Sequence, residues 1–462
     1  MKRKARLAVV PTALLLLSAC GLTSGGGIAD ADALRRAVAA GTGVVRLAPG
    51  VIEISEPIEI PNGAQELEII GDPSGTTLRV APQFAGKAVL VFRSASRITL
   101  SGFSIEGHRA SVDEPIGLPP SNVTFLDFYS NNGLVFEDVQ GLSISDLSFA
   151  EIANYPIIVN AGKEIVIESV HIRDSGSLNE SGRNNASGGI LLENGTSDFV
   201  VRGSLFDHVR GNGVWTHSRY ESPRNSDGLI EGNKFRMTAR DAIQIGHATR
   251  IRVLRNHGSK IGYPNEEVDI EGQGFPVAID TSGNTDETIY AENAFEDLNG
   301  KCIDLDGFHH GEIRDNRCIN NGPLEDYPLG HFGIVMNNAN PDMESAEIKI
   351  SGNIIDGAVY GGLFLIGSRH EVLGNQFLNL NRVGCRAGSA DPRCNYWPDE
   401  PALLRTGIYL GKRAERPADT RDNVIRDNVI TGLGMHSACI AAAPGLSLSD
   451  NQIGENECRE KE

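Results

Sequence analysis

The chain has 462 residues and a formal net charge of −18, with 60 acidic side chains against 42 basic ones. An acidic surface of this kind repels nucleic acid, which excludes a nucleic-acid-binding protein as the leading class. The length would allow two ordinary domains, but repeat folds of this length commonly form a single body, so length alone does not set the number of domains.

Residues 1–19 have the pattern of a secretory signal. Four of the first six residues are basic, and residues 7–17 form an apolar run that is too short to span a membrane as a mature helix. The run ends in Leu17-Ser18-Ala19-Cys20, which resembles the bacterial lipobox. The resemblance implies cleavage before Cys20, a lipid anchor on its thiol, and an exported protein at the outer membrane or cell surface. The alternative is an ordinary secreted protein in which Cys20 is incidental. Residues 20–29, rich in Gly and Ser, are predicted to be a tether.

Six cysteines remain besides Cys20, an even number that is typical of an oxidising compartment. Local closure favours three disulfides, Cys302 with Cys318, Cys385 with Cys394, and Cys439 with Cys458. No Cys-x-x-Cys pair is present, so no structural zinc site is predicted.

Residues 30–50 are predicted to form an N-terminal cap. Residues 30–40 read as a short amphipathic helix, with Asp30 or Asp32 as its N-cap and Gly41 as its stop. The next segment, Gly-Val-Val-Arg-Leu-Ala-Pro-Gly over residues 43–50, begins the strands. This pattern is similar to the start of many β-helix enzymes that act on polysaccharides, in which the helix plugs the open end of a solenoid. A plug shields an apolar cross-section and unpaired strand edges.

Residues 51–462 carry a repeat marked by asparagine. Four of the gaps between successive members are 22 or 23 residues, and the others are longer by an insertion. The eight members are Asn233, Asn256, Asn293, Asn316, Asn353, Asn375, Asn428 and Asn451. A period of this size with short β-rich segments indicates a solenoid with three strands per coil. It resembles the right-handed parallel β-helix of the pectate-lyase-like superfamily, which implies a single all-β domain. We expect the asparagines to form a structural ladder at one turn.

One strand of each coil can be aligned by its inward apolar pair, such as Ile303/Leu305 aligned with Val277/Ile279. The outward positions then gather polar and aromatic side chains in the middle coils, and insertions flank the same strand on both sides. We expect these insertions to wall a groove along the solenoid. The predicted substrate-binding residues are Trp215, His217, Gln244, His247, Asn337 and Trp397.

The predicted catalytic group is an acidic cluster followed by two histidines. Asp304 and Asp306 alternate with apolar residues, so both point outward from one strand, and His309-His310 follows. The alignment places Asp280 directly over Asp306 and diagonally from Asp304 at roughly 8 Å. Carboxyls this close cannot all ionise cheaply, so one should keep its proton near neutral pH.

A protonated acid beside an ionised one is what glycoside hydrolysis requires. The group is loosely similar to that of polygalacturonase-type hydrolases, whose characteristic motifs this chain does not reproduce, so no residue role is carried over. The favoured function is a glycoside hydrolase that cleaves a polysaccharide.

Three alternatives stay open at this stage. A polysaccharide lyase or C5-epimerase acting on a uronate would need a base and a neutralising cation, for which Arg240, Lys260, Lys301, Arg314 and His309 are candidates, and Asp304 with Asp306 could hold Ca²⁺. The aspartates could instead be structural, capping turns or holding Ca²⁺. The third alternative is a surface lipoprotein that binds glycan without turnover.

Overall fold

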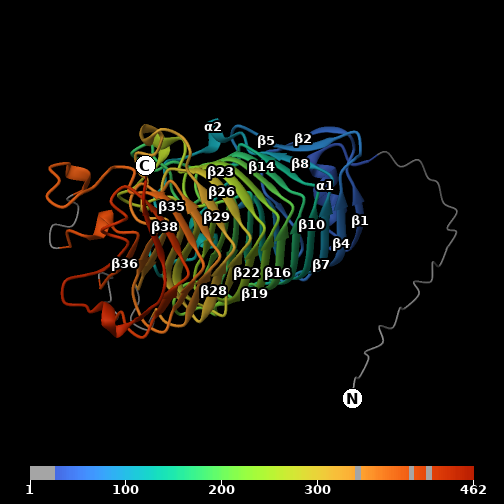
Figure 1. Ribbon diagram of the computed structural model, residues 1–462. Helices are drawn as coiled ribbons and strands as arrows, with labels where there is room; N and C mark the ends of the chain where they lie inside the picture. The colour runs from blue at the N-terminus through green and yellow to red at the C-terminus, as the bar shows by residue number, and fades with distance from the viewer. Residues whose placement is uncertain (1–26, 339–344, 395–399, 413–418, 462) are drawn as a thin grey trace, which may run out of the picture.

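The computed structural model describes residues 27–338, 345–394, 400–412 and 419–461. Cys20 with the preceding signal, and Trp397, lie outside the described residues. The chain winds into one elongated solenoid of parallel strands that runs from the N-terminal coils to the C-terminal coils without a break into separate bodies (Figure 1). In the described part of the chain, no helix is both long and apolar enough to cross a membrane.

Each coil contributes one strand to each of three faces, which we call faces 1, 2 and 3. Face 1 consists of β3 (Ile58–Glu59), β6 (Ala88–Arg93), β9 (Asn132–Glu137), β12 (Ile157–Asn160), β15 (Ile190–Glu193), β18 (Val214–His217), β21 (Ile243–Ile245), β24 (Val277–Asp286), β27 (Lys301–His309), β30 (Ile334–Asn337), β33 (Leu363–Leu365), β36 (Ile408–Leu410) and β39 (Ile440–Ala442).

Face 2 consists of β1 (Gly43–Arg46), β4 (Gln65–Ile70), β7 (Ser96–Ser101), β10 (Gln140–Ser145), β13 (Lys163–Glu168), β16 (Ser197–Arg202), β19 (Asn225–Glu231), β22 (Ala248–Leu254), β25 (Ile289–Ala291), β28 (Gly311–Arg314), β31 (Ile348–Ser351), β34 (Glu371–Leu373), β37 (Val424–Arg426) and β40 (Gln452–Ile453).

Face 3 consists of β2 (Gly50–Ile54), β5 (Thr76–Val80), β8 (Ser104–Glu106), β11 (Ser148–Ala150), β14 (His171–Ser175), β17 (Leu205–Val209), β20 (Lys234–Thr238), β23 (His257–Ile261), β26 (Ala294–Leu298), β29 (Arg317–Ile319), β32 (Ile354–Asp356), β35 (Gln376–Leu380), β38 (Val429–Gly432) and β41 (Glu457–Glu460).

Helical segments are short and lie at the ends and in the loops. They are α1 (Ala31–Val38), α2 (Arg109–Val112) and α3 (Phe125–Phe128), with single 3₁₀ turns η1 (Asn265–Glu267), η2 (Leu324–Asp326), η3 (Pro392–Cys394), η4 (Leu403–Arg405) and η5 (Leu448–Asp450). The predicted cap helix is confirmed as α1, and its N-cap is Asp30, whose carboxylate accepts a hydrogen bond from the Ala33 amide at 2.8 Å. Figure 1 shows α1 beside the first coil.

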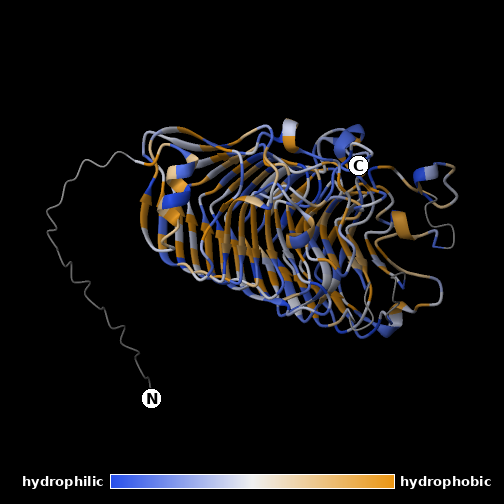
Figure 2. Cartoon of the chain, turned by 180° about the vertical axis from the view of Figure 1, so that it is seen from behind, coloured by the Kyte–Doolittle hydropathy of each residue, from blue (hydrophilic) through white to orange (hydrophobic). Residues whose placement is uncertain are grey.

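The core is the interior of the coils, where one side chain of each alternating pair points inward. Phenylalanines stack from coil to coil, with the Phe92 and Phe136 rings 4.8 Å apart and the Phe206 and Phe235 rings 4.7 Å apart. Apolar residues follow the strands throughout the solenoid (Figure 2). The stack of inward side chains therefore forms one continuous core and fixes which residues face outward.

The predicted asparagine ladder is present, with one correction at its end. Each amide nitrogen donates to the amide oxygen of the next coil at 2.8–3.0 Å, along the series Asn233, Asn256, Asn293, Asn316, Asn353, Asn375, Asn428 and Asn456. The last member is Asn456, whereas Asn451 accepts from Asn423 in a separate pair. Spacing alone misassigned Asn451 because it follows Asn428 by 23 residues while the true coil closes after 28.

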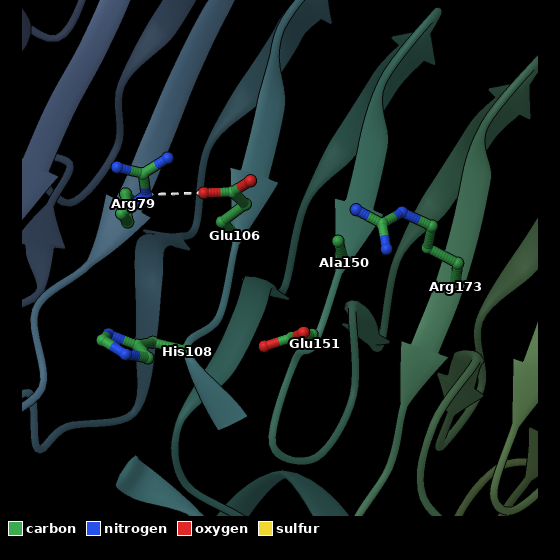
Figure 3. A pocket seen from close by; sticks show the side chains of 6 residues that line it. All are labelled: Arg79, Glu106, His108, Ala150, Glu151 and Arg173. Carbon is green, nitrogen blue, oxygen red and sulfur yellow. Dashed lines mark hydrogen bonds and ion pairs between the residues drawn. The ribbon is translucent and has the colours of Figure 1, made fainter. Parts of the chain in front are cut away.

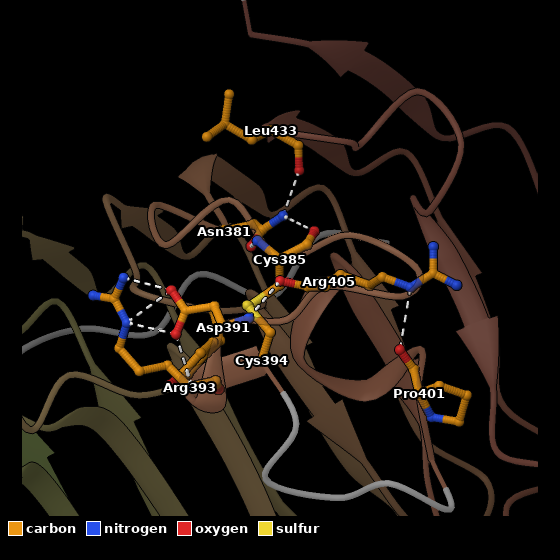
Figure 4. The surroundings of a disulfide bond; sticks show 10 residues. Asn381, Cys385, Asp391, Arg393, Cys394, Pro401, Arg405 and Leu433 are labelled. Atoms are coloured by element: carbon orange, nitrogen blue, oxygen red, sulfur yellow. Dashed lines mark hydrogen bonds and ion pairs between the residues drawn. A yellow bond between two sulfur atoms is a disulfide. The ribbon is translucent and has the colours of Figure 1, made fainter.

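All three predicted disulfides are present, Cys302–Cys318, Cys385–Cys394 and Cys439–Cys458. The second closes a tight loop near the C-terminal end of the solenoid (Figure 4). In this loop the Asn381 side chain donates to the carbonyl oxygens of Cys385 and Leu433, at 3.0 and 2.8 Å. The loop is thus tied both to itself and to the last coils.

Candidate active site

The acidic cluster lies on the outer side of face 1, but its register differs from the predicted one. Asp280 on β24 pairs with Asp304 on β27, and Ser282 pairs with Asp306. The prediction that Asp280 stacks directly over Asp306 is therefore wrong by two residues.

The error arose from an inward threonine. Thr281 fills the inward position next to Leu305, and its hydroxyl is satisfied within the core by the Tyr290 hydroxyl at 2.8 Å. An alignment on apolar pairs alone passed over this polar inward residue. In the observed register, Asp306 is the residue diagonal to Asp280, at roughly 8 Å from strand spacing and rise.

Asp280 and Asp304 are 9% and 8% exposed, and a third acid, Asp241, is 2% exposed beside them. Two cations are interleaved with these carboxyls. Lys301 Nζ lies 2.5 Å from Asp304 Oδ2, and Arg240 Nε lies 3.5 Å from Asp241 Oδ2. Three acids and two bases are therefore enclosed together, so the cluster favours one carboxyl that keeps its proton.

That proton is best placed on Asp280. Burial raises the pKa of Asp280 well above its ordinary value, and the neighbouring Asp241 and Asp304 raise it further. Burial also raises the pKa of Asp241 to about 6, although Arg240 opposes the rise. Burial by itself lowers the pKa of Lys301, but Asp304 beside it more than compensates, so the pKa of Lys301 is raised and the ammonium stays charged.

A half-buried histidine borders the same cluster. Its position before β30 places the His331 ring 5.2 Å from the Phe275 ring, and Lys301 Nζ lies 5.9 Å from the Phe275 centroid. Burial lowers the pKa of His331 to about 3, and Lys301 lowers it further. His331 is therefore neutral at physiological pH and cannot supply a positive charge.

Sequence reasoning missed Asp241 and His331. Asp241 lies two residues before the inward Ile243, and Lys301 lies two residues before the inward Ile303. The sequence alignment compared only the outward positions between and after the two apolar residues of each strand. Comparing also the position two residues before the first apolar residue would have found Asp241. His331 lies in an insertion, and no strand pattern places it.

The predicted substrate-binding residues fall in different surroundings. Gln244 pairs in register with Asp280 and accepts a hydrogen bond from Asn212 at 2.5 Å, so it belongs to the cluster. Asn337 pairs with Asp306 and is half-buried. His247 lies at the end of β21, with its ring 5.5 Å from that of Tyr220.

Trp215 and His217 lie under α3 instead of facing solvent. Trp215 is 6% exposed, and its ring meets Phe125 edge-on at 4.8 Å while the Arg240 guanidinium lies 5.6 Å from its centroid. The His217 ring lies 4.6 Å from Phe125, and His217 Nδ1 is 3.2 Å from Glu193 Oε1. In this arrangement the Trp215 ring is covered by protein side chains.

The two predicted catalytic histidines lie beyond the corner of β27 formed at Gly307. His309 pairs in register with Asp286, and its Nε2 is 2.9 Å from Asn284 Oδ1. His309 Nδ1 is 2.7 Å from His310 Nδ1, and His310 Nε2 lies 3.5 Å from Glu347 Oε2. Both histidines therefore belong to the face 2 end of this strand, whereas Asp280 and Asp304 share the face 1 part.

Some of the basic residues named for the lyase or epimerase alternative also lie away from the acidic cluster. Arg314 lies on face 2 among Glu292, Glu312 and Asp315, and Lys260 lies on face 3. Only Arg240 and Lys301 of that set join the acids. Among the described residues, no group of three or more His, Cys, Asp or Glu side chains is arranged to hold a metal ion.

Face 3 offers a hollow of about 410 Å³, lined by Arg79, Glu106, His108, Ala150, Glu151 and Arg173 (Figure 3). It lies where the small Ala150 interrupts a ladder of opposite charges along the strands. Arg79 Nε is 2.6 Å from Glu106 Oε2, and Arg173 is paired with Asp174 at 3.1 Å. Both arginines of this hollow are thus already paired with neighbouring acids, and we assign the hollow a structural role.

Comparison with known proteins identifies the family. A family model described as the right handed beta helix region matches residues 120–264 and 268–377, which is more than half of the chain. The protein therefore belongs to the right-handed β-helix family, and the predicted fold class is confirmed. A search of curated proteins found no significant match.

Several solved structures share this fold. The chain is similar to the N-terminal fragment of bacteriophage Phi29 gene product 12, at 11% identity and TM-score 0.60, covering 91% of this chain and 70% of that one. It is similar to PfbA, a surface adhesin of Streptococcus pneumoniae, at 15% identity and TM-score 0.56, covering 77% and 90%.

It is also similar to the catalytic unit of a thermostable GH87 α-1,3-glucanase from Streptomyces thermodiastaticus, at 14% identity and TM-score 0.52, covering 95% and 70%. The chain spans 57% of the length of ORF18 of Geobacillus virus E2, at TM-score 0.45. At these identities the likeness extends to the fold alone, and the fold serves both glycan-acting enzymes and adhesins.

Proposed function

We propose that the protein is a glycoside hydrolase whose active site is the acidic cluster on face 1. The observation that carries this proposal is the pairing of Asp280 with Asp304 on adjacent coils, enclosed with Asp241 and two cations. Burial and the neighbouring acids raise the pKa of Asp280, which suits a carboxylic acid that donates a proton to a leaving group. A cluster that only capped turns would not need a carboxyl held protonated in this way.

The register supports distinct roles for the three outward acids. Asp280 is the proton donor to the glycosidic oxygen. Asp306, diagonal to it at roughly 8 Å, has the separation that places a water between acid and base in an inverting mechanism. Asp304 is held by Lys301 and lies next to Asp280, where its charge favours the protonated form of the donor. The proposal therefore predicts hydrolysis with inversion at the anomeric carbon.

A polysaccharide lyase or C5-epimerase acting on a uronate is the second candidate. The observation that favours it is the pair of cations, Arg240 and Lys301, at the acidic cluster. Arg240 Nε faces Asp241 at 3.5 Å, whereas its buried Nη1 makes no hydrogen bond within the described structure. A guanidinium or an ammonium at this place would neutralise a substrate carboxylate that displaced the acids from it. Ca²⁺ bound by Asp304 and Asp306 stays a prediction of this alternative.

One experiment separates these functions. Mature protein is incubated with starch, dextran, α-1,3-glucan, xylan, polygalacturonate, alginate and hyaluronan, with and without EDTA. Reducing ends without absorbance from unsaturated sugars support the hydrolase, and the anomer released, read by NMR, tests inversion. Unsaturated products that disappear with EDTA support the lyase. Glycan retained without turnover supports a binding protein and contradicts the enzymatic proposal.

We also propose that the protein is exported and anchored through a lipid on Cys20. The three disulfides support an oxidising compartment. Expression of the full chain with labelled palmitate should label the wild-type protein and leave Cys20→Ser unlabelled. Equal labelling of both forms would contradict the anchor.

A further inference from the structure

We propose that the active site is closed at both ends along the solenoid, so that the enzyme acts on chain ends or short oligosaccharides and not on the interior of a long polymer. This inference rests on the hydrolase proposed above and concerns the form of its substrate. It is carried by two walls on the outer side of face 1, one on each side of the acidic cluster.

The wall on the N-terminal side is made by α3. Phe125 lies on Trp215, one coil before Gln244 and two coils before Asp280 in the outward column. Behind it the outward side chains are fully covered, with Leu191 at 0% exposure. The apolar cluster under α3 includes Tyr129, Tyr155 and the outward residues of the preceding coils. A glycan lying along the column would meet this cluster within two coils of the acids.

This wall is held in place at both ends of α3. Glu193, which is 0% exposed, accepts hydrogen bonds from the Phe125 and Leu126 amides at 2.8 and 3.1 Å. Lys87 Nζ donates to the carbonyl oxygens of Leu126, Asp127 and Tyr129 at 2.7–3.1 Å. A segment fixed by the buried Glu193 and the half-buried Lys87 is a rigid part of the site.

The wall on the C-terminal side is made by residues 400–405, which follow the Cys385–Cys394 loop in the same insertion between β35 and β36. Phe364 and Tyr409, which continue the outward column, are 7% and 0% exposed. The Tyr409 hydroxyl donates to Glu400 Oε2 at 2.8 Å, and Leu403 on η4 is buried. Figure 4 shows the disulfide and the side chains that tie this loop to the body of the solenoid.

Between the walls, the outward side chains that reach solvent are the exposed Ser282 and the half-buried Asp306, Val335 and Asn337, beside the acids Asp280 and Asp304, which are 9% and 8% exposed. These residues lie on three consecutive coils, so the reachable stretch is about 10 Å long at the spacing of parallel strands. A continuous groove, which the sequence predicted, is therefore interrupted at Trp215 and at Phe364.

The test uses any glycan that the wild-type protein cleaves in the panel above, with reducing ends and viscosity followed together. We expect one short product from the earliest time points, with viscosity almost unchanged. Titration of Asp280→Asn with oligosaccharides of increasing length should show an affinity that levels off within a few sugar units. Immediate loss of viscosity with products of random length would overturn the inference while leaving the hydrolase intact.

Phe125→Ala tests the N-terminal wall. It should raise the loss of viscosity per reducing end several-fold, because removing the Phe125 ring lets a long glycan extend over Trp215 and be cut in its interior. The matched control is Phe128→Ala on the same helix, whose ring packs on Tyr129 at 5.1 Å and which should keep the wild-type ratio. Equal ratios in a folded Phe125→Ala variant and in the wild type would contradict the role of the wall. If the panel glycans are neither cleaved nor bound, the proposed function fails and this inference fails with it.

Discussion

Asp280→Asn is expected to make the protein more stable at neutral and basic pH while removing most of its activity. In the unfolded chain the carboxyl ionises near its ordinary pKa of 3.8, but in the folded protein burial, Asp241 and Asp304 keep it protonated. The wild-type protein therefore loses stability as the pH rises above about 4, up to the folded pKa of Asp280. Asparagine resembles the protonated acid and has no proton to lose, so the variant escapes this loss.

Each unit by which folding raises the pKa of this carboxyl costs about 1.4 kcal/mol once the unfolded chain has ionised. Because burial and two neighbouring acids raise the pKa of Asp280 well above its ordinary value, we expect Asp280→Asn to gain more than about 1 kcal/mol in free energy of unfolding over the wild type at pH 8, and less than that at pH 4. Loss of a general acid should lower kcat by about 10²- to 10⁴-fold.

The assay is urea unfolding followed by circular dichroism at pH 4, 6 and 8, with hydrolysis measured on the same samples. The control is Asp227→Asn, because Arg250 lowers the pKa of this exposed carboxyl and its contribution is instead lost as the pH falls. That control should change stability by at most about 0.5 kcal/mol. A less stable Asp280→Asn at pH 8, or one that keeps its activity, would refute the reasoning.

Three further predictions concern the surroundings of the acid. Lys301→Met leaves the Asp304 carboxylate without its partner, and should cost about 3 kcal/mol in urea unfolding at pH 7; a loss below about 1 kcal/mol would mean that the pair is not buried in solution. Asp304→Asn removes a charge that raises the pKa of Asp280, so the loss of activity at high pH should begin at a lower pH than in the wild type; an unchanged pH profile would mean that Asp304 does not raise the pKa of the proton donor. Asn316→Ala breaks the middle of the ladder and should cost about 2–4 kcal/mol because buried amides lose partners, whereas Asn456→Ala at its end should cost less; equal losses would contradict a cooperative ladder.

Much of the fold could be predicted because its signals are local and repeated. Asparagines such as Asn293 and Asn316 mark one turn of successive coils, and the cap helix has an aspartate at its start. The disulfides could be paired because each joins cysteines that are close in sequence.

The site was predicted less well because its details depend on side-chain partners that are distant in sequence. Thr281 can point inward because its hydroxyl is hydrogen-bonded to the Tyr290 hydroxyl within the core. The predicted register took Val277 and Ile279 as the inward pair, and it therefore differs from the observed register of Asp280 by two residues. The wall at Phe125 rests on Trp215, 90 residues further along the chain, and on the buried Glu193. No local pattern around residues 107–130 indicates that this segment covers face 1.

The pH dependence of kcat/KM for the wild type and for Asp280→Asn tests the central claim most directly. The account predicts that wild-type activity falls on the basic side as Asp280 loses its proton, and that this basic limb is missing from the residual activity of the variant. The same basic limb in both proteins, with similar kcat/KM, would contradict the assignment of Asp280 as the proton donor.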